Sequence, residues 1–200
     1  AEIPEALAAR ERDPQILLAG ERDGLRIRVD LTGSIDFDLG NSPREFTAEK
    51  VRGKTIAMTT TNGTRALRAC AHAKAVLAAS FLNLTATARA VEQAAPLDLI
   101  LVCSGTFEQT AYEDVLGAGA LCDLVWHRYG RGSVADSALM AHRLYLQEQQ
   151  DLTAGLSRAR NGARLLSRPD LKDDVAFCAQ RDRLDLCAQL GRDGLVRKVS

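Results

Sequence analysis

Residues 59–64 form a short run of hydroxyl and amide side chains whose chemistry suits a small anion. The run reads TTTNGT and stands between the apolar residues 56–58 and a helical pattern that begins at Arg65. Hydroxyls donate hydrogen bonds, glycine lets the backbone approach a ligand closely, and a helix start offers free N–H groups. The sequence therefore predicts a phosphate site made of Thr60, Thr61, Asn62, Gly63, Thr64 and Arg65.

The Asn62-Gly63 pair has a second interpretation, because Asn-Gly is the strongest short signal for a β-hairpin turn. A hairpin needs another strand after the turn. Residues 64–73 are instead rich in Ala, Leu and Arg and read as a helix. The phosphate loop is therefore preferred, and the hairpin is the alternative.

A second polar loop, Ser104-Gly105-Thr106, directly follows the apolar run 97–103. In open α/β sheets, ligands bind at the carboxyl ends of the strands, where loops lead into helices. If the strands before the two loops are parallel, both loops open on the same edge of the sheet. Ser104, Gly105 and Thr106 are therefore predicted to contact the substrate as well.

Glu113 and Asp114 form an acidic pair at the start of a predicted helix that runs to about residue 128. Thr110 and Glu113 have the spacing of a capping box, so Glu113 is expected to be structural. Asp114 either favours the helix dipole or holds a divalent cation beside the bound phosphate. We predict the second role, which makes Asp114 a catalytic residue and a metal ligand.

Two further polar turns carry weaker signals. Glu21 and Arg22 follow the apolar run 16–19, where Arg22 could pair with phosphate oxygens and Glu21 could bind metal or accept a proton. Asn41 and Ser42 could donate to an oxyanion. The competing interpretations are a solvated turn for the first pair and local backbone hydrogen bonds for the second. We place all four residues in the predicted site, with Glu21 and Arg22 as catalytic residues and Glu21 as a second metal ligand.

The elements that must position these residues alternate between short apolar runs and longer helical patterns. The predicted strands are 16–19, 54–59, 75–81 and 97–103, and the helices between the last three are 64–73 and 84–95, the latter with Asn83 as N-cap. This rhythm is typical of a mainly parallel sheet covered on both faces. After residue 103 the pattern is mostly helical, with helices near 134–149, 151–166 and 171–180. A late edge strand at 184–190 and the turn 191–194 precede a final short strand.

Composition limits the function further. The 200 residues, 46% of them hydrophobic, suffice for one domain with a substantial core and contain no run long enough to span a membrane. The 26 basic and 26 acidic residues balance, which argues against nucleic acid and membrane surfaces as partners and favours a small charged metabolite. Five cysteines without CxxC spacing are typical of reduced thiols in a cytoplasm. The sequence leaves open whether the chain forms a homo-oligomer.

The polar segments occur in an order that resembles the 2-phosphosulfolactate phosphatase family. They are LAGER at 18–22, GNSP at 40–43, TTTNGTRAL at 59–67, and ED at 113–114 with AGA at 118–120. The likeness extends from about residue 16 to the DVAFC stretch at 174–178, and the TTNGT block is its most specific part.

The resemblance implies a three-layer α/β/α fold and Mg²⁺-dependent hydrolysis of 2-phosphosulfolactate to sulfolactate and phosphate, a step in coenzyme M biosynthesis. Alternatives are a phosphatase for another small phosphorylated hydroxy acid and a non-catalytic relative that binds a phosphometabolite. Family members typically begin with a strand that carries an Asp and an Arg, and residues 1–200 do not begin with such a strand. We therefore expect residues 1–200 to form a single phosphatase-like domain that lacks this strand.

Overall fold

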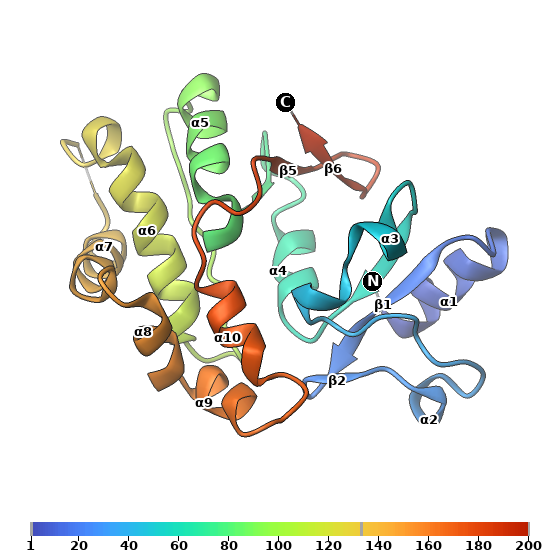
Figure 1. The fold of residues 1–200 in the computed structure, drawn as a ribbon. Helices are drawn as coiled ribbons and strands as arrows, with labels where there is room; N and C mark the ends of the chain where they lie inside the picture. The colour runs from blue at the N-terminus through green and yellow to red at the C-terminus, as the bar shows by residue number, and fades with distance from the viewer. Residues whose placement is uncertain (1, 133, 200) are drawn as a thin grey trace. The chain divides into compact units, whose positions relative to one another are not determined.

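A computed structural model describes residues 2–132 and 134–199 of the chain (Figure 1). By its internal contacts the chain divides into two compact units, residues 1–65 and 66–200. Each unit has its own hydrophobic core and is described by itself.

Unit 1 is built around a small sheet of three strands in the order β2-β1-β3. β1 and β3 pair in parallel from Leu17 opposite Ile56 to Gly20 opposite Thr59, whereas β1 and β2 form an antiparallel hairpin. Its elements are α1 (Ile3–Arg12), β1 (Leu17–Arg22), β2 (Leu25–Arg26), α2 (Val29–Thr32), η1 (Pro43–Glu45), α3 (Ala48–Val51), β3 (Ile56–Thr59) and the start of α4 (Gly63–Ala69).

The core of unit 1 packs α1 against the sheet through Ala6, Leu18, Ile27 and Phe37, which are at most 1% exposed. Gly20 is required by the strand pairing. Its φ of +153° disfavours other residues, and a Cβ there would lie 2.0 Å from the carbonyl oxygen of Thr59. This close approach holds the end of β1 against the end of β3.

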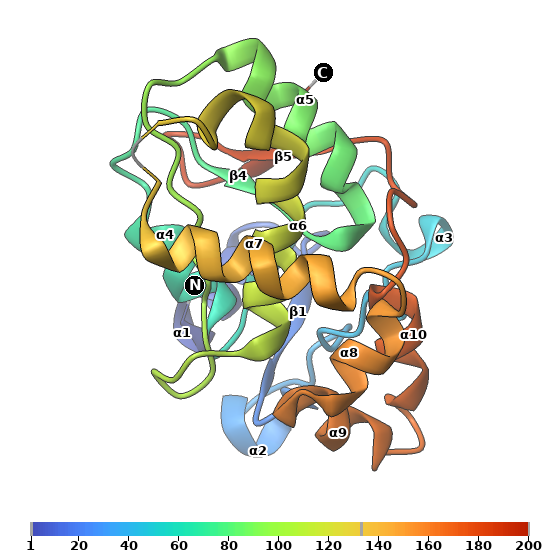
Figure 2. The ribbon, with the colours of Figure 1, turned by 90° about the vertical axis from the view of Figure 1, so that its left-hand side faces the viewer.

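Unit 2 is mainly helical and carries an antiparallel sheet in the order β4-β5-β6. α6 and α7 make its most extensive helix contact, and Figure 2 shows α7 lying across α6. The elements are β4 (Leu77–Ala78), η2 (Phe81–Asn83), α5 (Leu84–Ala94), α6 (Tyr112–Tyr129), α7 (Asp136–Glu148), α8 (Leu152–Arg158), α9 (Arg160–Leu166), α10 (Lys172–Cys178), β5 (Cys187–Leu190) and β6 (Val196–Val199).

The core of unit 2 gathers apolar side chains from several helices. Leu116 and Tyr145 are fully buried at its centre, on α6 and α7. At Gly119 a Cβ would lie 2.1 Å from the carbonyl oxygen of Ala141, so this glycine is what lets the two helices approach.

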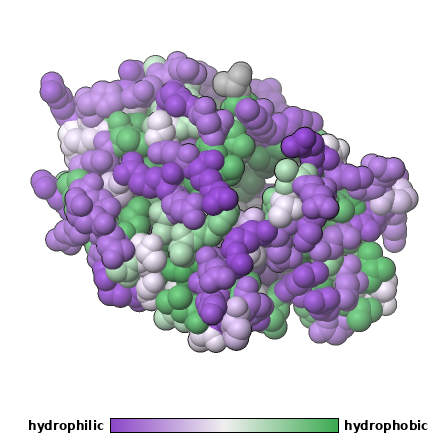
Figure 3. All heavy atoms as spheres, in the orientation of Figure 1, coloured by the Kyte–Doolittle hydropathy of each residue, from purple (hydrophilic) through white to green (hydrophobic). Residues whose placement is uncertain are grey.

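On the outside, hydrophilic residues cover most of the face drawn in Figure 3, with apolar residues scattered among them.

Most predicted helices are confirmed within one to a few residues. α5, α6, α7 and α10 match the predicted segments, and the helix after residues 59–62 begins at Gly63, so the hairpin alternative is wrong. The predicted helix 151–166 is two helices, because the chain is extended at Ala159, where ψ is 146°. Asn83 is the N-cap of α5, but its side-chain oxygen accepts hydrogen bonds from Ser80 and not from the helix.

The predicted mainly parallel sheet is only partly correct. β1, β3, β5 and β6 are confirmed, β4 is shorter than predicted, and β1 with β3 is the parallel strand pair among the described residues. The chain is therefore α/β with two small sheets, one mixed and one antiparallel.

Residues 97–103, a strand by their sequence pattern, belong to no strand in the structure. Leu99 and Leu101 pack on the core of unit 2, whereas Leu97, Ile100 and Val102 are 96%, 80% and 57% exposed. From Leu99 to Val102 the residues thus alternate as in a strand, but a strand also needs a neighbour for its backbone N–H and C=O groups. This segment pairs with no strand among the described residues. The sequence pattern does not reveal whether such a neighbour is present.

Within the described ranges, every helix is too short or too polar to cross a lipid bilayer.

Candidate functional site

In unit 1, three polar segments follow three parallel stretches of backbone. Leu39 pairs in parallel with Ala19 of β1, and β1 pairs in parallel with β3. Because parallel stretches have their carboxyl ends at the same edge, the residues after Leu39, the end of β1 and the residues after Thr59 all lie at one edge of the sheet. The structure therefore brings together, within unit 1, the predicted groups Asn41 and Ser42, Glu21 and Arg22, and residues 60–64.

Glu21 links two loops at this edge. Its carboxylate is buried, 8% exposed, and accepts hydrogen bonds from the backbone N–H groups of Thr61 and Gly24, each at 2.8 Å. Two N–H donors offset much of the cost of burying the negative charge. Glu21 thus fixes the backbone of the predicted phosphate loop.

Arg22 places a positive charge beside the same loop. Its Nη2 donates to Thr59 Oγ1 at 3.0 Å and its Nη1 to the carbonyl oxygen of Glu21 at 2.7 Å. A guanidinium has five N–H donors in a rigid fork, so these two bonds orient the group and leave further donors for an anion.

The hydroxyls of residues 60–64 divide into two kinds. Thr60 and Thr64 bond to each other's backbone: Thr64 N–H donates to Thr60 Oγ1 at 3.1 Å, and Thr64 Oγ1 donates to the Thr60 carbonyl at 3.0 Å. Thr61 Oγ1 differs, because it is a buried side-chain oxygen for which the described residues provide no hydrogen-bond partner. Such atoms are rare in folded proteins and call for an explanation such as a ligand.

The other predicted residues of unit 1 differ in their exposure. Asn41 is exposed, and Ser42 is buried, 6% exposed, and precedes η1 as its N-cap. Asn62 is half-buried and Gly63 is exposed at the start of α4, and Arg65 is an exposed residue of that helix.

In unit 2, Asp114 holds the second predicted loop. Its Oδ2 accepts hydrogen bonds from the backbone N–H of Gly105 at 2.7 Å and from Ser104 Oγ at 3.2 Å. Partial burial raises the pKa of Asp114 above its ordinary value and the charge of Glu113 adds to the rise, while the bonds from Gly105 and Ser104 oppose it. The structure therefore joins Asp114 with the predicted residues Ser104 and Gly105.

Glu113 does not form the predicted capping box. α6 begins at Tyr112 with Ala111 as N-cap, which places Thr110 one residue too early to cap the helix. Glu113 Oε1 instead accepts a short hydrogen bond from Asn161 Nδ2, which also donates to Thr106 Oγ1 at 2.7 Å. Asn161 thereby connects Glu113 to the third residue of the predicted loop.

Sequence reasoning missed Asn161, which lies inside the stretch predicted as one helix. The available signal was the Asn161-Gly162 pair, because both residues are poor helix formers and are unexpected in a helix interior. The sequence does not show that α9 brings this pair to the loop, since the contact joins residues 55 positions apart in the chain.

Magnesium prefers oxygen ligands, and the Asp114 carboxylate and the Ser104 hydroxyl are of that kind. Among residues 2–132 and 134–199, no three His, Cys, Asp or Glu side chains are grouped so as to hold a metal ion. Mg²⁺ commonly binds through one or two carboxylates plus substrate phosphates and keeps several waters. The carboxylate of Asp114 and the hydroxyl oxygen of Ser104 therefore fit this ion. The Glu21 carboxylate is of the same type, but each of its oxygens already accepts a backbone N–H.

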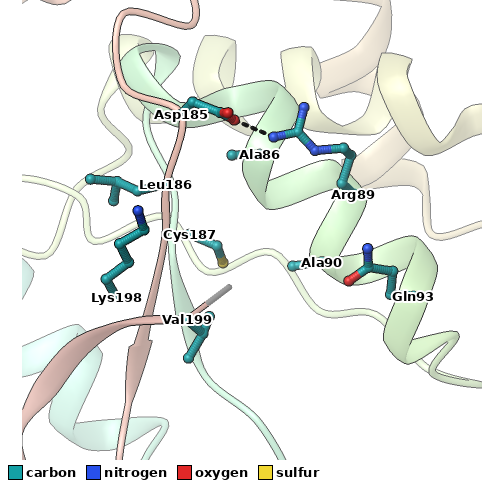
Figure 4. Close-up of a pocket in the computed structure, with 9 residues that line it drawn as sticks. All are labelled: Ala86, Arg89, Ala90, Gln93, Asp185, Leu186, Cys187, Lys198 and Val199. Carbon is teal, nitrogen blue, oxygen red and sulfur yellow. Dashed lines mark hydrogen bonds and ion pairs between the residues drawn. The ribbon is translucent and has the colours of Figure 1, made fainter.

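A pocket of about 240 Å³ lies elsewhere in unit 2, between α5 and the strands β5 and β6 (Figure 4). Arg89 and Asp185 at its rim form an ion pair, and Cys187 is buried in its wall. None of the predicted site residues lines this pocket, so we do not assign it to the candidate site.

Comparison with known proteins shows the family to which the chain belongs. Residues 1–192 match the family described as 2-phosphosulpholactate phosphatase. A protein of Synechococcus sp. (strain JA-3-3Ab), named probable 2-phosphosulfolactate phosphatase, is 39% identical over 184 residues, which are 90% of this chain and 72% of that protein. Proteins of the same name from Caldicellulosiruptor saccharolyticus and Thermotoga petrophila are 35% and 36% identical, over 99% and 90% of this chain and 80% and 72% of theirs. The chain therefore belongs to the 2-phosphosulfolactate phosphatase family.

Proposed function

We propose that this protein hydrolyses 2-phosphosulfolactate to sulfolactate and inorganic phosphate with Mg²⁺ as cofactor. Family membership supports the reaction class. The observation that carries the assignment is the loop after β3, which Glu21 holds by the Thr61 N–H and in which the Thr61 hydroxyl is buried without a partner among the described residues. A phosphate oxygen would satisfy that hydroxyl.

The residues have distinct roles in this proposal. Residues 60–64 bind the phosphate, with the Thr61 hydroxyl as a donor, and Arg22 neutralises charge that develops on the phosphate oxygens. Asp114 binds the cation and Ser104, Gly105 and Thr106 contact the substrate. Glu21 keeps the phosphate loop in place. It is also a predicted metal ligand, because each carboxylate oxygen has a lone pair that its N–H donor does not use.

The reaction needs no covalent step with the protein, because water can serve as the nucleophile. Bound Mg²⁺ would neutralise phosphate oxygens and lower the pKa of that water. The protein's part is to hold phosphate donors in a fixed geometry, which stabilises the transition state without reorganisation during the reaction.

Colorimetric measurement of phosphate release tests the proposal. Purified protein should release phosphate from 2-phosphosulfolactate in the presence of Mg²⁺, and a chelator should abolish the release. A panel of other phosphorylated hydroxy acids tests whether the substrate is a different one. Absence of release from every member of the panel, with Mg²⁺ present, would overturn the proposal in favour of a relative that only binds phosphometabolites.

We further propose the fold, the location and the pathway of this protein. The fold is a three-layer α/β/α sandwich in which residues 1–200 form a single domain. The protein works in the cytoplasm. Its product enters coenzyme M biosynthesis.

A further inference from the structure

The turn that follows the second predicted loop has an unusual backbone. Thr106 and Gln109 pair with each other through two backbone hydrogen bonds of 2.9 and 3.1 Å. Between them, Phe107 and Glu108 have φ angles of +51° and +59°. Two successive left-handed residues form a tight hairpin turn that strongly favours Gly and Asn, so two other residues persist there only if the surroundings hold them.

The start of α9 holds both ends of this turn. Asn161 Nδ2 donates to Thr106 Oγ1 at 2.7 Å, and Arg160 Nη1 donates to Gln109 Oε1 at 2.7 Å. Asn161 also donates to Glu113, the neighbour of Asp114. Two adjacent residues of α9 therefore fix the segment that begins at Ser104, which contains three predicted substrate-binding residues.

Arg160 has the properties of an anion-binding residue at this place. It is exposed, and the bond to Gln109 uses one of its five N–H donors. No carboxylate pairs with it among the residues that the structure describes. The Gln109 bond restrains the side chain beforehand, which lowers the entropy that the guanidinium would lose on binding an oxyanion.

The proposed substrate supplies the matching groups. 2-Phosphosulfolactate carries a sulfonate and a carboxylate besides its phosphate, and each of these two groups can offer a pair of oxygens to a guanidinium. Glu113 lies near the same segment, where Asn161 contacts it, and its negative charge would repel these groups unless a positive charge stands close by. Arg160 brings such a charge to the Gln109 end of the segment.

We propose that Arg160 determines specificity by binding an acidic group of the substrate other than the phosphate, and that Asn161 is the positioning residue that keeps the turn in place. The proposal rests on the proposed function for the identity of the substrate. A merely structural Arg160 would tie α9 to Gln109 and leave substrate preference unchanged.

The test compares wild-type protein with Arg160→Ala on three phosphate esters: 2-phosphosulfolactate, 2-phospholactate, which lacks the sulfonate, and the phosphate ester of 2-hydroxyethanesulfonate, which lacks the carboxylate. Arg160→Ala should raise KM for 2-phosphosulfolactate about tenfold with kcat little changed, as expected for the loss of one charged hydrogen bond. The ester on which the substitution has no effect identifies the group that Arg160 binds. An equal loss on all three esters, or no loss on any, would overturn the proposal.

Two controls separate a binding role from a structural one. Arg164→Ala removes an exposed arginine one turn along the same helix and should leave KM for every ester unchanged. Arg160→Lys keeps the charge without the fork and should recover part of the affinity.

Calorimetry with sulfolactate, which has no phosphate, keeps this test separate from that of the proposed function. Weaker binding of sulfolactate by Arg160→Ala than by wild type supports the Arg160 assignment, whether or not the wild type releases phosphate. Release of phosphate by the wild type together with equal sulfolactate binding by both proteins would reject Arg160 and leave the proposed function standing.

Discussion

At the scale of residues, buried polar atoms divide into those that fold the loops and those left for a ligand. Glu21, Thr60 and Thr64 have their hydrogen bonds satisfied within unit 1, whereas Thr61 Oγ1 has no partner among the described residues. Asp114 occupies a middle position, because it accepts bonds from Gly105 and Ser104 in a partly buried setting that favours its neutral form. The predicted site thus contains residues whose hydrogen bonds hold the loops and residues whose polar atoms can still bind a ligand.

Replacing Thr61 and replacing Thr60 should have different effects on stability. Thr61→Val removes a buried hydroxyl that has no partner in the described part of the chain, so stability should be unchanged or slightly higher. Thr60→Val leaves the N–H of Thr64 without its acceptor and should cost about 1 kcal/mol. Urea denaturation of both variants and wild type measures the difference. A Thr61→Val protein that is less stable than Thr60→Val would show that Thr61 Oγ1 has a structural partner.

Asp114→Asn should lower kcat at least about a hundredfold if the carboxylate binds the cation that stabilises the transition state.

Because the pKa of Asp114 is raised in the folded protein, folding favours its protonated form. Stability is therefore lost as the pH rises from the pKa of Asp114 in the unfolded chain through its pKa in the folded protein. Without metal, Asp114→Asn should therefore be more stable than wild type at pH 7, and the two should converge near pH 3.

Thermal melts in the presence of a chelator, at pH 3 and pH 7, check the stability part of this prediction. A wild-type protein that is more stable than Asp114→Asn at pH 7 would mean that the bonds from Ser104 and Gly105 outweigh the cost of burying the charge. Unchanged kcat would remove Asp114 from the cation role.

At the scale of elements, two glycines of α6 provide a matched pair. A Cβ at Gly119 would lie 2.1 Å from the carbonyl oxygen of Ala141 in α7, whereas a Cβ at Gly117 would meet nothing within 4 Å. Gly119→Ala should force the helices apart and destabilise the protein by about 1–3 kcal/mol, as overpacking does. Gly117→Ala should stabilise it by about 0.5–1 kcal/mol through helix propensity. Equal effects in chemical denaturation would contradict the close α6–α7 packing.

Gly20→Ala tests the edge at which the unit 1 residues gather. The positive φ of Gly20 and the 2.0 Å approach to the Thr59 carbonyl predict a cost of about 2 kcal/mol or more. The substitution should also raise KM, because it displaces the loop after Thr59. Gly53→Ala is a control, since Gly53 also has positive φ but open space around it. Comparable KM values for both variants would argue that the β1–β3 contact does not position the loop.

Sequence patterns predict the elements that have strong periodicity and miss those decided by distant contacts. α5 and α6 follow from apolar spacing, and β1 and β3 from apolar runs. The turn at Phe107-Glu108 has no Gly or Asn to mark it, and its neighbour Thr106 bonds to Asn161 far along the chain. The break at Ala159 has only the weak signal of Asn161-Gly162 beside it. Residues 97–103 show the converse, since a clear strand pattern lacks the pairing that makes a strand.

At the scale of the whole molecule, the order of a few short polar segments along the sequence is enough to recognise the family. The match over residues 1–192 confirms that recognition. The meeting of Glu21, Arg22 and residues 60–64 at one edge of unit 1 is also predictable, because they follow predicted strands, whereas the parallel pairing of Leu39 that brings Asn41 and Ser42 there has no such signal. Asn161 and Arg160 are not, since only the folded chain brings α9 to the loop after residue 103.

Phosphate release from 2-phosphosulfolactate, measured side by side for wild type and Thr61→Val with Mg²⁺, tests the central claim most directly. The account predicts equimolar phosphate and sulfolactate from the wild type, and a kcat/KM at least about tenfold lower for Thr61→Val, the value of one lost hydrogen bond to a charged group. The variant should keep the stability of the wild type. A wild type that releases no phosphate, or a Thr61→Val protein with full kcat/KM, would contradict the account.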